Sequence, residues 1–238
     1  RWCSMKAIVL AAGKGSRLGK LTQSTPKCIL PVGGKSMLEH WFSIFSMYGV
    51  DEILINTHHL AGKVISHCAK SIDNGIKITF SYEKELLGTA KTIVENRSFV
   101  KDERYFLIVY ADTWMQIDLR KMMKIQKKHQ GMGTIGLYRP DSLKDQGCIE
   151  IEGRKIISIE EKPLHPKGKH SFAGIMIASQ AIYRFYNPGM DDLVRDWLPH
   201  IKEGLNPFFI DEFVYDIGTP ERYKLVNEKV RSLGLKAL

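Results

Sequence analysis

Short apolar runs alternate along the first half of the chain with longer segments whose apolar residues recur at helical spacing. This alternation is typical of βαβ units, in which a mostly parallel sheet is covered by helices on both faces. The expected strands are 6–10, 52–56, 76–82 and 105–110, and the expected helices are 37–48 and 60–69. Gly49 follows the first helix at the usual C-terminal position for glycine. The pattern predicts an α/β fold with a doubly wound, mostly parallel mixed sheet, similar to a Rossmann fold.

After Gly131 the pattern changes to short strand-like pieces separated by glycine, proline and charged residues. The expected strands are 134–138, 148–152, 156–159 and 172–177, and we assign them to a small β-rich, mixed or antiparallel extension. A helix over 191–201, a strand near 212–215 and a final helix over 220–233 follow. Thr219 can cap the final helix, and Pro220 suits its first position.

The 238 residues, 44% of them apolar, can form one large α/β domain or two small ones, and we favour a single domain over residues 5–238. Residues 1–4 precede Met5 and read as a leader or an expression remnant. There is no run of 18 apolar residues and no secretory pattern, so we expect a cytoplasmic protein without a membrane partner. Cys3, Cys28, Cys68 and Cys148 are widely spaced, which favours reduced thiols over a zinc site or a disulfide framework.

The formal charge of +9 raises the question of nucleic acid. Its densest basic stretch, residues 120–128, has the spacing of a solvated helix face. A polyanionic substrate is a second use for positive charge, because phosphorylated ligands bring several negative charges into one cleft. We favour that use and expect no nucleic-acid partner.

The most informative stretch is the glycine-rich segment 10–27, which directly follows an apolar strand. Gly13 and Gly15 allow backbone N–H groups to approach phosphate oxygens, because glycine has no Cβ in the way. Arg17 and Lys27 can neutralise the remaining phosphate charge, one with a planar fork of donors and the other with a compact ammonium. The segment is not a P-loop, because Gly-x-x-x-x-Gly-Lys-Ser/Thr is absent. It is not a dinucleotide fingerprint either, because Leu18 stands where the third glycine would fall. It predicts polyphosphate binding.

The string from Gly13 to Leu18, followed by Pro26-Lys27, resembles the signature of the sugar-1-phosphate nucleotidyltransferases. The resemblance covers residues 5 to about 225 and implies that family's fold. It also implies nucleotide contacts from Leu10, Ala11, Ala12, Gly13, Gly15, Ser16, Arg17, Lys27, Glu85, Gly88, Thr89 and Asp112. Ala12, Lys20, Ala111 and Phe172 depart from residues common in the family, which bears on the choice of substrate more than on the reaction type.

Asp112 follows the strand 105–110 and should lie at its carboxyl end, where open α/β sheets bind ligands. Mg²⁺ usually takes one or two carboxylates together with water and substrate phosphate oxygens, so a second acid is expected. We choose Asp216, and the resemblance implies a metal-binding role for both aspartates.

The resemblance further implies an acceptor-binding pocket, which we expect the β-rich extension to carry. Lys162 is expected to grip the phosphate of the sugar 1-phosphate, and Glu161 to accept hydrogen bonds from sugar hydroxyls. Gly147, Ala173 and Gly174 are expected to line the same pocket. No convincing nucleophile arrangement is present, and we interpret His58 and His59 as loop residues.

The sequence therefore predicts a Mg²⁺-dependent transfer of a nucleotidyl group from a nucleoside triphosphate to a sugar 1-phosphate, with release of pyrophosphate. We favour GTP and a mannose- or heptose-type acceptor. UTP, or CTP with a phosphocholine-like acceptor, stays open, as do a homo-oligomer, a nucleotide-sensing regulatory subunit without turnover, and a basic RNA-binding module.

Overall fold

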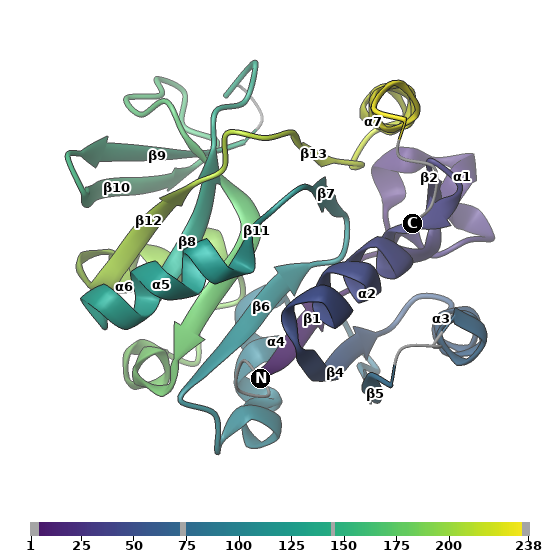
Figure 1. Ribbon diagram of the computed structural model, residues 1–238, viewed down its shortest axis with the longest axis horizontal. Coiled ribbons are helices and arrows are strands. Elements are labelled where there is room, and N and C mark those ends of the chain that lie inside the picture. The colour runs from purple at the N-terminus through teal and green to yellow at the C-terminus, as the bar shows by residue number, and fades with distance from the viewer. Residues whose placement is uncertain (1–4, 72–74, 144–145, 235–238) are drawn as a thin grey trace. The chain divides into compact units, whose positions relative to one another are not determined.

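The computed structural model describes residues 5–71, 75–143 and 146–234 (Figure 1). The chain divides into two compact units, each built from separate segments. The first combines residues up to Leu86 with 110–116 and the segment from Phe213, and the second combines 87–109 with 117–212. The leader assigned to residues 1–4 lies outside the described residues, and the single catalytic domain stays a prediction.

Seven strands belong to one mixed sheet, which confirms the predicted α/β class. The first unit contributes β1 (Met5–Leu10), β4 (Val50–Thr57) and β5 (Lys77–Tyr82), in that order and all parallel. Strand β1 is almost wholly buried, as expected for a parallel strand with both faces covered. Its carboxyl end at Leu10 leads directly into the glycine-rich segment.

Helix α2 (Met37–Tyr48) packs on β4 in this unit and has the bounds that the sequence predicts. Ser36 and Glu39 form a reciprocal capping box at its start, and Gly49 ends it with φ 72°. Helix α3 (Ala61–Ser71) connects β4 to β5.

The first unit is completed by several short elements and by the longer helix α7. It contains η1 (Ser16–Leu18), α1 (Lys20–Gln23), η2 (Lys27–Ile29), β2 (Pro31–Val32), β3 (Lys35–Ser36), β7 (Thr113–Met115), β13 (Val214–Asp216) and α7 (Pro220–Ser232). One hydrophobic cluster joins them, formed by Leu18, Leu30, Val32, Met37, Trp114, Ile217, Val226 and Val230. Apolar burial therefore brings the glycine-rich segment together with two segments that are distant in the sequence.

The second unit contributes β6 (Tyr105–Tyr110), β11 (Ser171–Ser179), β8 (Gly133–Tyr138) and β12 (Leu205–Phe209) to the sheet. Strand β11 is antiparallel to both β6 and β8, while β12 is parallel to β8. Helix α5 (Leu119–His129) packs on β8, β11 and β12 (Figure 1). The lysines and the arginine of its basic stretch are exposed.

Helices of this unit include α4 (Thr89–Glu95), η3 (Arg97–Val100), η4 (Gln180–Phe185), a π-helical turn (Leu193–Trp197), α6 (Leu198–Ile201) and η6 (Lys202–Gly204). The helix predicted over 191–201 is thus a π-helical turn followed by a short α-helix.

Strands β9 (Gly147–Glu152) and β10 (Lys155–Glu161) form a separate antiparallel pair (Figure 1). This pair is the predicted β-rich extension. Strands β8 and β11, which the sequence pattern assigned to the extension, pair instead within the main sheet.

None of the helices in the described part of the chain is long and apolar enough to cross a membrane. Cys28, Cys68 and Cys148 are free and buried, while Cys3 lies outside the described residues. Burial raises the pKa of the Cys28 and Cys68 thiols to about 12, so both are protonated at neutral pH.

Candidate functional site

The glycine-rich loop of the first unit owes its path to Gly15, whose φ of 64° lies in the left-handed region. A Cβ atom at Gly15 would lie 2.9 Å from Thr22 Cγ2 and 3.3 Å from Lys27 Cβ. The Thr22 hydroxyl also donates to the Gly15 carbonyl over 2.9 Å. The loop is therefore packed tightly against Lys27, which is expected to bind phosphate.

A left-handed conformation costs a residue with a Cβ about 1–2 kcal/mol. Because the Cβ of an alanine at position 15 would also press against Thr22 and Lys27, we expect Gly15→Ala to destabilise the protein by more than that amount. Gly49 is the matched control, because it is also left-handed, with φ 72° and ψ 31°, but a Cβ there meets nothing within 4 Å. We expect Gly15→Ala to lower the free energy of unfolding in urea more than Gly49→Ala does. Equal losses would mean that contact with Thr22 and Lys27 does not constrain the loop.

The start of the loop is held by Asn56, the next-to-last residue of β4. Its side-chain oxygen accepts from the amide N–H groups of Ala11 and Ala12, over 2.6 and 3.3 Å. Its side-chain nitrogen donates to Glu83 Oε1 over 2.7 Å, and both Asn56 and Glu83 are buried. The sequence analysis gave neither residue a role. The amides of Ala11 and Ala12, two residues expected to contact the nucleotide, are thus held by Asn56.

Further along the loop, the amide N–H groups of Gly13, Lys14 and Gly15 find no protein acceptor among the described residues. Three successive amides in an exposed glycine-rich turn form a concave set of donors of the kind that binds anions. Ser16 and Arg17 follow directly, and both are exposed. The loop therefore offers backbone donors and a guanidinium from one short stretch.

Lys27 begins η2 and is only 8% exposed. Its Nζ forms an ion pair with Asp112 Oδ2, and a buried ammonium needs such a partner. Asp112 follows β6, as predicted, and the amide of Ala111 donates to the Leu10 carbonyl over 3.0 Å. The end of β1, Lys27 and Asp112 thus lie together in the first unit.

Strand pairing brings the Asp216 segment next to Asp112. In the antiparallel pair β7–β13, Asp216 lies opposite Thr113, and the amide of Ile217 donates to the Asp112 carbonyl over 3.0 Å. The Asp216 carboxylate accepts from the Gly218 amide over 2.8 Å and pairs with Arg222 of α7.

Arg17 lies beside this segment as well, because a Cβ atom at Gly218 would be 3.1 Å from Arg17 Nη2 and 2.5 Å from Asp216 Oδ1. Any side chain at position 218 would displace one or the other. The absence of a Cβ at Gly218 therefore lets the guanidinium approach the aspartate segment.

The donor chemistry of the two aspartates fits Mg²⁺, which prefers carboxylate oxygens and completes its shell with water and phosphate. Among the described residues, no group of three or more His, Cys, Asp or Glu side chains has a geometry that could hold a metal ion. Each carboxylate now carries one basic partner, Lys27 on Asp112 and Arg222 on Asp216, and an ionised carboxylate retains further lone pairs. Arg222 is a residue that the sequence analysis missed, although it stands six positions after Asp216.

The predicted acceptor residues lie in the second unit. Gly147 and Glu161 are paired across β9–β10, and a Cβ at Gly147 would lie 3.1 Å from Glu161 Oε2. Lys162 has φ 47°, which non-glycine residues rarely adopt, and its amide donates to the Gln146 carbonyl over 3.2 Å. Its Nζ lies 3.8 Å from Glu161 Oε1; the Lys162 side chain is exposed and the Glu161 side chain is partly buried.

Burial of part of the Glu161 side chain raises its pKa above the usual value. The ammonium of Lys162 opposes that shift, the carboxylate of Asp192 adds to it, and the guanidinium of Arg195 opposes it. Two charged residues that the sequence analysis did not single out therefore act on the predicted acceptor carboxylate.

Ala173 and Gly174 lie in β11, where the register with β8 shifts between Phe172 and Met176. Gly174 has φ 75°, and both residues are buried. The irregularity removes this part of β11 from regular pairing, which is common beside binding sites.

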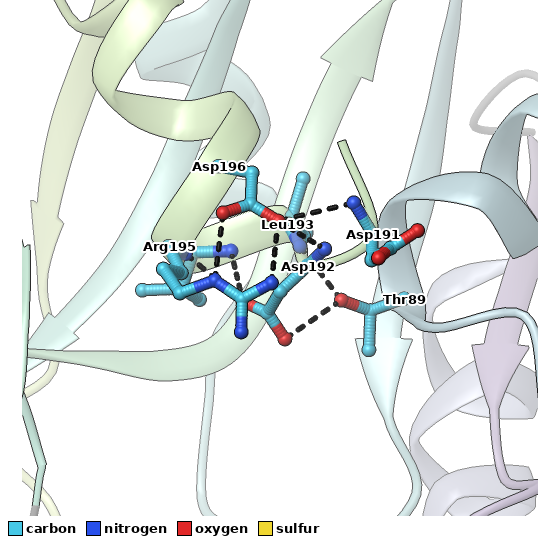
Figure 2. A network of polar contacts seen from close by, with 7 residues as sticks. Thr89, Asp191, Asp192, Leu193, Arg195 and Asp196 are labelled. Carbon is cyan, nitrogen blue, oxygen red and sulfur yellow. Dashed lines mark hydrogen bonds and ion pairs between the residues drawn. The ribbon is translucent and has the colours of Figure 1, made fainter. Parts of the chain in front are cut away.

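Gly88 and Thr89 also belong to the second unit and contact the segment 191–193 (Figure 2). Gly88 has φ 83°, and a Cβ there would lie 2.4 Å from the Asp191 carbonyl oxygen. The Thr89 hydroxyl donates to Asp192 Oδ2 over 3.2 Å and accepts from the Leu193 amide over 2.7 Å. Glu85, also expected to contact nucleotide, is exposed in the first unit.

His58 and His59 follow β4, as expected for loop residues. One ring nitrogen of each, Nδ1 of His58 and Nε2 of His59, lies within hydrogen-bond distance of a backbone carbonyl. The partners are the carbonyls of Glu83 at 2.9 Å and Thr22 at 3.0 Å. Both rings therefore support loops of the first unit.

Comparison with known proteins identifies the family to which the chain belongs. The family model described as nucleotidyl transferase matches residues 6–231. The chain belongs to this family, which confirms the resemblance seen in its sequence.

The names of individual relatives refer to different nucleotides. The chain is 29% identical over 224 residues to a D-glycero-alpha-D-manno-heptose 1-phosphate guanylyltransferase from Campylobacter jejuni, covering 92% of this chain and 97% of the relative. It is 26% identical to a UTP–glucose-1-phosphate uridylyltransferase from Synechocystis, covering 86% of this chain and 57% of that protein. A crystal structure of a putative glucose-1-phosphate thymidylyltransferase from Bacillus anthracis superimposes with a TM-score of 0.86 at 25% identity, covering 96% of both chains.

Proposed function

We propose that this protein transfers a nucleotidyl group from GTP to a mannose- or heptose-type sugar 1-phosphate and releases pyrophosphate. The observation that carries the proposal is the meeting, within the first unit, of Gly15, Lys27, Asp112, Arg17 and the Asp216 segment. These residues come from three separate parts of the sequence and provide backbone donors, cations and carboxylates at one place. Such a set suits a triphosphate and a divalent cation.

In the proposed reaction, a phosphate oxygen of the sugar 1-phosphate attacks the α-phosphorus of the triphosphate in line. A new bond forms between that oxygen and the α-phosphorus, and the bond from the α-phosphorus to the bridging oxygen breaks, so that pyrophosphate carries the electron pair away. The attacking oxygen is anionic near neutral pH, and the step needs neither a general base nor a covalent intermediate. The chain's contribution is positioning and charge neutralisation.

Each residue has a specific part in this proposal. The amides of Gly13, Lys14 and Gly15 hold phosphate oxygens, while Arg17 and Lys27 offset charge on the triphosphate and the departing pyrophosphate. Lys162 holds the acceptor phosphate, and Glu161 accepts hydrogen bonds from the sugar. Asp112 and Asp216 would hold Mg²⁺, which supplies charge neutralisation to the phosphate oxygens.

Preference for GTP rests on the guanylyltransferase relative and on the segment from Glu85 to Ala90, which resembles that branch. UTP is the second candidate because a uridylyltransferase also matches. The deciding experiment measures pyrophosphate release from GTP, UTP, CTP and dTTP, each with several sugar 1-phosphates. We expect release that depends on the acceptor and is fastest with GTP and mannose or heptose 1-phosphate. Fastest release with another triphosphate would overturn the choice of base while leaving the reaction type intact.

A further inference from the structure

The π-helical turn Leu193–Trp197 of the second unit lies against both groups of predicted substrate residues in that unit. It packs on α4, which begins at Thr89, and on β10, which ends at Glu161. Asp192 caps the start of the turn and forms hydrogen bonds both within the turn and to Thr89 (Figure 2). The sequence analysis gave this turn no functional role.

Asp192 uses both carboxylate oxygens. Oδ1 accepts from the amides of Val194 and Arg195, each over 2.9 Å, and so caps the turn. Oδ2 accepts from the Thr89 hydroxyl, which in turn accepts from the Leu193 amide. One aspartate therefore holds the turn together and fastens it to the start of α4.

A second aspartate fixes the approach to the turn. Asp196 Oδ2 accepts from the amides of Asp191 and Asp192 over 3.0 and 2.8 Å, and Arg195 makes a two-pronged contact with the same carboxylate (Figure 2). The Asp191 carbonyl then accepts from the Ala90 amide over 2.9 Å. The start of α4 is thus tied to this turn by backbone as well as side-chain hydrogen bonds.

The other end of the linkage reaches the acceptor residues. A Cβ atom at Gly147 would lie 3.4 Å from Val194 Cγ1 and 3.1 Å from Glu161 Oε2, so Val194 and Glu161 bound the same small space. Asp192 and Arg195 also influence the charge state of Glu161. A displacement of the turn would therefore alter both the packing and the electrostatic surroundings of the predicted acceptor site.

We propose that Asp192 and Thr89 are positioning residues that couple the Gly88–Thr89 segment, assigned to the nucleotide, to the Gly147–Glu161 pair, assigned to the sugar phosphate. The inference rests on the proposed function for the identity of the two substrates. Its distinctive consequence is that a change at Thr89, on the nucleotide side, weakens binding of the acceptor.

The test compares Thr89→Val, which keeps the side-chain shape and removes the hydroxyl, with Thr89→Ser, which keeps the hydroxyl. We expect Thr89→Val to raise the KM for the sugar 1-phosphate on the order of tenfold, the scale of losing one hydrogen bond to a charged group. Thr89→Ser should restore most of that loss. A rise confined to the KM of the triphosphate would overturn the coupling.

Hydrogen–deuterium exchange of the substrate-free protein tests the linkage without relying on turnover. Thr89→Val and Asp192→Ala should each speed amide exchange in the segment 147–161 as well as in 191–197. Asp118→Ala is the matched control, because Asp118 caps α5 in the same unit by the same kind of contact with the amides of Arg120 and Lys121. Its effect should stay within α5.

Exchange in 147–161 that matches wild type in both variants would overturn the proposal, whatever the protein's activity. A wild-type protein that releases no pyrophosphate with any substrate pair would instead contradict the proposed function. The two failures are therefore separable.

Discussion

Arg17→Ala should lower the rate of pyrophosphate release by about 10²–10³-fold, the scale measured when one preorganised charge-stabilising donor is removed from an active site. The guanidinium is exposed and lies beside Gly218 and the Asp216 segment, so its loss removes charge from the proposed phosphate site without emptying the core. Steady-state kinetics with saturating triphosphate measures the effect, and the melting temperature should stay close to that of wild type.

Two variants sharpen this prediction. Arg17→Lys retains the charge but loses the planar fork, so it should fall between wild type and alanine. Lys20→Ala removes an exposed cation two residues beyond the loop's Leu18 and should change the rate by less than about twofold, as expected of a screened surface charge. Wild-type turnover in Arg17→Ala would remove Arg17 from the proposed mechanism.

Asp112→Asn should reduce activity by at least about 10²-fold and raise the Mg²⁺ concentration needed for half-maximal rate, because an amide is a weaker ligand for a divalent cation than a carboxylate. The change also leaves the Lys27 ammonium, 8% exposed, without its charged partner. We therefore expect lower stability as well, although by less than a fully buried pair would lose, since the Asp112 side chain is 34% exposed.

Binding of Mn²⁺, followed by electron paramagnetic resonance in the presence of triphosphate, separates the metal effect from lost stability. Asp112→Asn and Asp216→Asn should both weaken Mn²⁺ binding by more than about tenfold. Asp211→Asn changes an exposed aspartate of the second unit and serves as control. Wild-type Mn²⁺ affinity in both Asp112→Asn and Asp216→Asn would exclude these carboxylates as ligands.

Much of the fold follows from local pattern. Helix α2 has the predicted bounds because its cap, its apolar stripe and Gly49 all specify the same segment. Strand β12 was missed because it is short and contains Pro207, which reads as a break in isolation. The pairing of β8 and β11 with the main sheet was also missed, because strand order depends on long-range contacts that a local pattern does not contain.

Some residues of the candidate site could also be predicted from the sequence, and others could not. Gly15, Lys27, Asp112 and Asp216 could be selected from motifs, since glycine at a turn and acids after strands have direct chemical meaning. Asn56 could not, because a polar residue near the end of a buried strand has no signal until its contacts with the amides of Ala11 and Ala12 are seen. Asp192 was missed for a similar reason, since its importance comes from Thr89, which lies about one hundred residues earlier in the chain.

The most direct test of the account follows two labels through one reaction. Triphosphate labelled at the α-phosphorus should give labelled sugar nucleotide, and triphosphate labelled at the γ-phosphorus should give labelled pyrophosphate, both only when the sugar 1-phosphate and Mg²⁺ are present. No label should remain on the protein after denaturation. α-Label retained on the protein, or γ-label released as inorganic phosphate without sugar nucleotide, would contradict direct nucleotidyl transfer.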